Sequence, residues 1–185
     1  MRVLTIPNVL TIFRLILVPF VCYNIIFSNF NKALILIIIA VITDGLDGFI
    51  ARKFNQTSAL GKIIDPIADK TLVIMGIIGL YLSEPPKISV FLLLIIIFRE
   101  VYILAGTSYL LVFVKNFQIK PTVIGKFTAF TQFLMLISII AENVFQWLNG
   151  FAHFTKILVV IFVIISVLQY SYIGFSYIGR GHGDL

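Results

Sequence analysis

The sequence predicts an all-α integral membrane protein with six transmembrane helices. Of its 185 residues, 60% are apolar and only 12% are charged, which leaves more apolar surface than a soluble domain can bury. The apolar residues fall into runs of roughly 18 to 25, and about 20 apolar residues span a bilayer core as a helix. Unbroken apolar stretches such as residues 33–42 lack the alternation of a membrane β-strand.

Six segments follow this pattern, and short polar connections separate them. The first contains Arg14 and lacks the cleavage pattern of a secretory signal, so we expect it to be a retained helix. Without a linker, a low-complexity stretch or a repeat, residues 1–185 are expected to form a single membrane domain. The one cysteine, Cys22, excludes an internal disulfide and a thiolate metal site. The predicted helices cover residues 11–27, 32–52, 60–82, 88–112, 121–141 and 156–178.

Basic residues are distributed unequally between the connections. By the positive-inside rule, both termini and the second and fourth connections are expected to face the cytoplasm, in a multi-pass protein of the cytoplasmic membrane. The net charge of +6 then suits membrane lipids and phosphorylated substrates, with no nucleic acid expected, although these residues could also serve only to set the topology. The cytoplasmic group is Arg2, Arg52, Lys53, Lys62, Lys115, Lys120, Lys126 and Arg180, against Lys32, Lys87 and Lys156 on the other side.

Four of the eight acidic residues lie within residues 44–69, at the facing ends of the second and third predicted helices. Asp44 and Asp47 are three positions apart, and Asp65 and Asp69 are four apart, so the members of each pair share a helix face. The short connection at residues 53–59 makes the two helices antiparallel neighbours. We therefore expect the four carboxylates to converge.

Such a cluster needs a compensating positive charge. Each aspartate in a membrane costs on the order of 3 kcal/mol to insert, and like charges at close range repel. The helix dipole favours Asp65 and Asp69 near a helix start and disfavours Asp44 and Asp47 near a helix end. An all-carboxylate set suits a hard divalent cation such as Mg²⁺, Mn²⁺ or Ca²⁺. The alternative is a structural cluster that is protonated or paired with Arg52 and Lys70.

Small residues accompany the aspartates, namely Gly45, Gly48 and Ala51 on the second helix and Gly61 at the start of the third. They clear side chains from the acidic face and leave room for a ligand. Close packing of membrane helices through small residues is the alternative explanation.

At these residues the sequence resembles the CDP-alcohol phosphatidyltransferases. Their signature, D-x-x-D-G-x-x-A-R-x(8)-G-x-x-x-D-x-x-x-D, is matched at every position from Asp44 to Asp69. The resemblance implies a CDP-diacylglycerol donor, an alcohol acceptor, a divalent cation (Mg²⁺ or Mn²⁺) and a homodimer. It implies that Asp44, Asp47, Asp65 and Asp69 bind the metal and that Asp69 is also the general base. By the same resemblance, Gly48, Ala51, Arg52 and Gly61 shape the CDP site.

The start of the first helix also matches a family pattern, P-N-x-L-T-x-x-R, at Pro7, Asn8, Thr11 and Arg14. The resemblance places Asn8 and Thr11 near the nucleotide. Capping of the first helix after Pro7 is an equally good explanation of both residues from the sequence alone.

Residues outside the signature should recognise the acceptor, and Arg99 and Lys126 are the candidates we select. An arginine within a membrane helix is costly, so Arg99 either pairs with Glu100 or a neighbour, or binds a substrate phosphate. The Phe98-Arg99-Glu100 step and the 125–132 stretch resemble phosphatidylglycerophosphate synthases, which use glycerol-3-phosphate, whereas residues 120–126 resemble CMP-releasing cardiolipin synthases, which use phosphatidylglycerol. The sequence V-Y-I-L-A-G-T-S-Y-L after Glu100 departs from the G-L-R segment usual in the first subgroup.

We therefore expect a membrane enzyme that transfers a phosphatidyl group from CDP-diacylglycerol to sn-glycerol-3-phosphate with release of CMP. Cardiolipin synthesis from phosphatidylglycerol is the alternative. A cation transporter or channel is a remote one, because a relay would distribute its acids along the membrane depth, whereas here they gather at one end of two helices.

Overall fold

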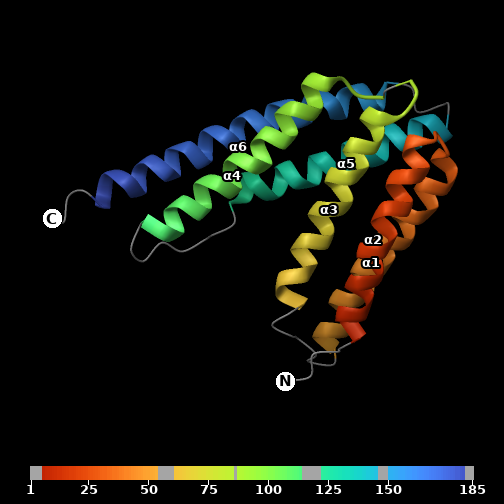
Figure 1. Cartoon of the computed structure of the whole chain (residues 1–185), viewed down its shortest axis with the longest axis horizontal. Coiled ribbons are helices and arrows are strands. Elements are labelled where there is room, and N and C mark those ends of the chain that lie inside the picture. The colour runs from red at the N-terminus through yellow and green to blue at the C-terminus, as the bar shows by residue number, and fades with distance from the viewer. Residues whose placement is uncertain (1–5, 54–60, 86, 114–121, 146–149, 182–185) are drawn as a thin grey trace. The chain divides into compact units, whose positions relative to one another are not determined.

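The computed structural model describes residues 6–53, 61–85, 87–113, 122–145 and 150–181, and within these ranges it contains six α-helices and no strand (Figure 1). The predicted all-α class is confirmed. The first helix begins five residues earlier than predicted, and the sixth also begins earlier. The helices are α1 (Ile6–Ile26), α2 (Phe30–Lys53), α3 (Gly61–Leu82), α4 (Val90–Phe113), α5 (Val123–Val144) and α6 (Phe151–Gly181).

The helices group into two compact units. The first unit contains α1, α2, α3 and the part of α5 from Leu136 onward, and the second contains α4, the part of α5 up to Met135, and α6. The prediction of a single membrane domain for residues 1–185 stays a prediction.

In the first unit, α1 is the central helix and packs against both α2 and α3. On α2 the buried face is a narrow stripe of Ala33, Ile37 and Ala40, at helical spacings of four and three. The small alanines bring the backbone of α2 close to α1. Asp44 comes four residues after Ala40, so it continues the stripe that faces α1.

The turn between α1 and α2 closes the end of the first unit opposite the aspartates. Ser28 adopts a left-handed conformation with φ of 57°, and the Asn29 amide donates to the Asn24 carbonyl at 2.8 Å. This is the hydrogen-bond pattern that ends many helices after a left-handed residue. It reverses the chain, so the C-terminal end of α2 lies beside the N-terminal end of α1.

Two glycines let α3 approach its neighbours. A β-carbon at Gly79 would lie 3.3 Å from the backbone carbonyl oxygen of Cys22 on α1 and 3.2 Å from Ile25, and one at Gly76 would lie 2.7 Å from the Leu136 side chain on α5. The Gly79 contact packs α3 closely against α1, and the Gly76 contact packs α3 closely against α5.

In the second unit, α4 and α6 run side by side (Figure 1). Thr122 caps α5 by accepting a hydrogen bond from the Gly125 amide at 3.0 Å. The Thr128 hydroxyl donates to the Phe162 carbonyl at 3.2 Å, and the rings of Phe127 and Phe162 stack with centroids 6.2 Å apart. Both contacts tie α5 to α6.

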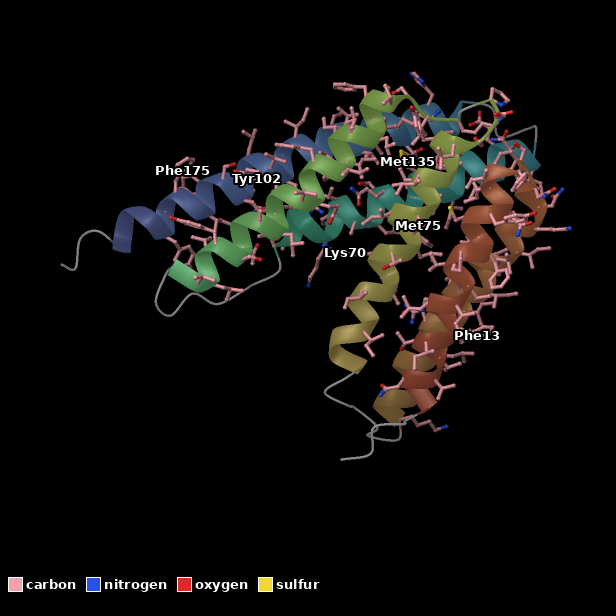
Figure 2. The ribbon with its side chains drawn as sticks, viewed as in Figure 1. Phe13, Lys70, Met75, Tyr102, Met135 and Phe175 are labelled. Carbon is pink, nitrogen blue, oxygen red and sulfur yellow. The ribbon has the colours of Figure 1, made fainter. Side chains whose placement is uncertain are left out.

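Within the described residues, four helices are long and apolar enough to cross a membrane. Large apolar side chains such as Phe13 and Phe175 are exposed on their surfaces (Figure 2), and so is Leu104. This arrangement is suited to lipid and not to water. The chain is therefore a membrane protein. The remaining helices, α2 and α3, carry charged residues such as Asp44 and Lys70 that shorten their apolar runs. The four spans are Asn8–Ile26, Val90–Val112, Val123–Val144 and Phe151–Tyr177.

Replacement of Gly79 tests the packing of the first unit. Gly79→Leu forces a side chain against the Cys22 carbonyl, and overpacking of this kind costs about 1–3 kcal/mol. We expect a lower midpoint of thermal unfolding in detergent. Gly106→Leu is the control, because a β-carbon there meets no described atom within 4 Å beyond its chain neighbours and the backbone of its own helix. Equal midpoints for the two variants would argue against the close α1–α3 contact.

Candidate functional site

A buried arginine on α1 brings together two of the predicted aspartates. The Nη1 atom of Arg14 lies 2.6 Å from Oδ1 of Asp44 on α2, and the same atom donates a hydrogen bond to Oδ1 of Asp69 on α3. Arg14 is 1% exposed, whereas the two carboxylates are 52% and 56% exposed. One guanidinium thus joins three helices, and the two aspartates remain open to a ligand on their exposed side.

The helix registers explain why these residues meet. Arg14 lies eight residues after the start of α1, Asp69 eight residues after the start of α3, and Asp44 nine residues before the end of α2. Because a helix rises 1.5 Å per residue, all three sit roughly 12 Å from the same end of the unit. The charges therefore share one depth as well as one face.

The buried stripe of α1 is polar at this end and apolar at the other. Asn8, Thr11 and Arg14 follow one another at intervals of three residues and are all buried, and the stripe continues with apolar residues such as Val18 and Ile25. Since α1 begins at Ile6, Asn8 and Thr11 lie inside the helix. This position does not fit the alternative that they cap it.

The other predicted residues of the signature lie on the same two helices, Asp47, Gly48, Ala51 and Arg52 on α2 and Gly61 and Asp65 on α3. Their side chains lie outside the described part of the structure. Among the residues that are described, no three His, Cys, Asp or Glu side chains form a metal-binding group. The metal and nucleotide roles of the signature therefore stay predictions.

The alternative from the sequence paired the aspartates with Arg52 and Lys70, and it did not include Arg14, the partner that the structure shows. Lys70 follows Asp69 on α3 and is exposed (Figure 2), and the ion pairs described for Asp44 and Asp69 are with Arg14. The sequence held a signal for this pairing, because an arginine within an apolar helix needs a nearby counter-charge.

In the second unit, Arg99 is also buried and paired. Its Nη1 contacts Oε1 of Glu100, while Nε and Nη2 donate to the Ser166 hydroxyl on α6 at 3.2 and 3.0 Å. Pairing with Glu100 was one of the two expectations for Arg99, and Ser166 is a partner that the sequence analysis missed. The Glu100 carboxylate neutralises the charge of the Arg99 guanidinium. The Ser166 hydroxyl fixes the orientation of this guanidinium between α4 and α6.

Other polar groups line the same unit. Gln132 on α5 is 4% exposed, and its Nε2 atom has no hydrogen-bond partner among the described residues. The Tyr102 and Ser171 hydroxyls are 2.7 Å apart. Lys126, the second predicted acceptor residue, lies near the start of α5 and is exposed. The structure thus adds Tyr102, Ser166 and Ser171 to the polar residues of this unit.

The site geometry defines a membrane protein with a carboxylate and guanidinium cluster between three helices. Comparison with known proteins identifies its class: the CDP-alcohol phosphatidyltransferase family model matches residues 4–170. The chain belongs to the CDP-alcohol phosphatidyltransferase family, a family of enzymes, and the transporter alternative is not retained.

Individual relatives fall into two groups. The chain is 29% identical to the CDP-diacylglycerol--glycerol-3-phosphate 3-phosphatidyltransferase of Aquifex aeolicus, over 95% of this chain and 98% of the relative. It is 34% identical to the protein of the same name from Wigglesworthia glossinidia brevipalpis, over 77% and 80%. It is also 37% identical to the human CMP-forming cardiolipin synthase, over 79% of this chain but 53% of that protein.

Removal of the Glu100 carboxylate tests the role of the Arg99 pair. Glu100→Ala leaves a buried guanidinium without its counter-charge, which costs on the order of 3 kcal/mol when the remaining charge stays buried. We expect a clear drop in the thermal midpoint. Glu84→Ala, at an exposed position in the turn after α3, should leave the midpoint nearly unchanged. If both variants melt alike, the pair does not stabilise the second unit.

Proposed function

We propose that this enzyme transfers the phosphatidyl group of CDP-diacylglycerol to sn-glycerol-3-phosphate and releases CMP. The observation that carries the proposal is the similarity to the Aquifex aeolicus enzyme, which extends over nearly the whole length of both chains. The complete signature at residues 44–69 and the meeting of Asp44 with Asp69 support the same chemistry.

The donor set suits a divalent cation, Mg²⁺ or Mn²⁺. Asp44 and Asp69 supply oxygen ligands from two helices, and both already contact one positively charged atom, while Asp47 and Asp65 lie one turn away along the same helices. A bound cation would neutralise charge on the diphosphate of the donor and on the departing CMP.

The remaining steps fall to the side chains. The acceptor oxygen attacks the phosphorus of the phosphatidyl group, the bond from that phosphorus to the CMP oxygen breaks, and Asp69 accepts the proton of the alcohol. In the cation-free protein the Arg14 contact holds the Asp69 carboxylate beside Asp44. Asn8 and Thr11, on the buried stripe that leads to Arg14, would contact the CDP moiety together with Gly48, Ala51, Arg52 and Gly61.

Arg99 and Lys126 are proposed to bind the acceptor phosphate. A phosphate monoester carries about −1.5 to −2 charges near pH 7. Lys126 supplies a positive charge for it, and Arg99, whose charge Glu100 offsets, supplies N–H donors. Glycerol-3-phosphate has such a phosphate, whereas phosphatidylglycerol offers a diester with a single negative charge. The same family resemblance supports a homodimer.

The proposed topology places six helices across the cytoplasmic membrane, with both termini and the aspartates on the cytoplasmic side. The bias of basic residues supports this orientation. It would give the site access to water-soluble glycerol-3-phosphate on one side and to CDP-diacylglycerol in the membrane.

Cardiolipin synthesis is the second candidate, and the 37% identity to the human cardiolipin synthase favours it. The chain spans about half the length of that relative. Purified protein incubated with CDP-diacylglycerol, Mn²⁺ and either acceptor separates the two. We expect phosphatidylglycerophosphate from glycerol-3-phosphate, and cardiolipin from phosphatidylglycerol as the only product would overturn the first candidate.

Substitution of Asp69 tests its role as the general base. Asp69→Asn keeps the size of the side chain but removes the proton acceptor, so turnover should fall by roughly 10²- to 10⁴-fold while CDP-diacylglycerol still binds. Turnover is followed by CMP release and binding by retention of labelled donor. Glu84→Gln is the matched control, and a variant Asp69→Asn with normal turnover would rule out the base assignment.

Substitution of Asp65 tests the cation assignment. Asp65→Ala removes one proposed oxygen ligand, so the Mn²⁺ concentration needed for half-maximal activity should rise by at least about tenfold, as one lost ligand contact of roughly 1.4 kcal/mol implies. The measurement is a titration of CMP release with Mn²⁺. An unchanged requirement would place the cation away from Asp65.

A further inference from the structure

Arg14 has an unusual position for a charged residue of a membrane protein. It lies within an apolar helix, its side chain is 1% exposed, and one of its nitrogen atoms contacts carboxylates from two different helices. A surface arginine that sets topology would be exposed at a helix end. Arg14 therefore has a role inside the first unit.

The electrostatics of the cluster suggest what that role is. Without Arg14, Asp44 and Asp69 would face each other as two negative charges at close range, and like charges there repel. The positive charge of Arg14 offsets part of this repulsion. The guanidinium contacts one oxygen of each aspartate, as a metal cation bound between the two carboxylates would.

We propose that Arg14 is a positioning residue that serves as the internal counter-ion of Asp44 and Asp69 in the cation-free protein and gives up this contact when a divalent cation binds. The inference rests on the proposed function, in which both aspartates bind the cation. It adds that cation binding and the Arg14 contact compete for the same two oxygens.

This competition has two consequences. A neutral residue at position 14 removes both a competitor and a nearby positive charge, so Mn²⁺ should bind more tightly, on the order of tenfold or more. The same change removes the positive charge that the structure places against both carboxylates. The cation-free protein should then be less stable, and Mn²⁺ should restore its stability.

The experiment compares the wild-type protein with Arg14→Met and Arg14→Lys in detergent, and it does not depend on turnover. Mn²⁺ binding is measured by the loss of the free-ion electron paramagnetic resonance signal, and stability by the thermal midpoint with and without Mn²⁺. We expect Arg14→Met to bind Mn²⁺ more tightly and to gain more in midpoint from Mn²⁺ than the wild type. Arg14→Lys keeps the charge and should resemble the wild type.

Arg99→Met is the matched control, since Arg99 is also a buried arginine paired with a carboxylate but contacts Glu100 and Ser166. It should lower the midpoint, and Mn²⁺ should not restore its stability beyond the gain seen in the wild type. A purely structural role for Arg14 would make Arg14→Met behave in the same way, which would overturn the proposal.

The remaining outcomes are also decisive. Unchanged or weaker Mn²⁺ binding by Arg14→Met contradicts the competition. If Arg14→Met is recovered folded only with saturating Mn²⁺, the proposal is supported, and if neither it nor Arg14→Gln folds even then, the proposal is wrong. Failure of the proposed function shows differently, as a wild-type protein that binds no Mn²⁺ or forms no lipid from CDP-diacylglycerol.

Discussion

The buried charge of Arg14 is the constraint on which the first unit depends. A guanidinium inside an apolar helix is tolerated only with a negative partner beside it, and the structure supplies two, Asp44 from α2 and Asp69 from α3. The depth of Arg14 on α1 therefore fixes the registers of both neighbouring helices. The alanine stripe of α2 and the close contact of Gly79 with the Cys22 carbonyl continue the same packing toward the other end.

The same principle organises the second unit with different residues. Arg99 is buried against Glu100 and Ser166, which links α4 to α6, and Thr128 links α5 to α6. Both units thus combine a largely apolar exterior with a few polar contacts in the interior, where a hydrogen bond or ion pair has no water to compete with it. Such contacts specify which helix faces meet, because apolar surfaces alone would distinguish little between alternative helix pairings.

Much of this could be predicted from the sequence. The apolar runs predicted the six helices that the structure describes, four of which are long and apolar enough to span a bilayer, and the signature predicted the family. The pairing of Asp44 and Asp69 with Arg14 was not predicted, because spacing within one helix says which residues share a face but not which face of another helix they meet. The partner Ser166 was missed for the same reason, since it lies 67 positions from Arg99.

We propose that Asp44 and Asp69, which Arg14 bridges in the cation-free protein, bind the cation used for phosphatidyl transfer. A crystal structure with Mn²⁺ and CDP-diacylglycerol, with the metal located by its anomalous scattering, tests it most directly. The account predicts an anomalous peak within coordination distance of Asp44 and Asp69 carboxylate oxygens and Arg14 Nη1 withdrawn from at least one of them. A Mn²⁺ peak remote from both aspartates, with Arg14 still bridging them, would contradict it.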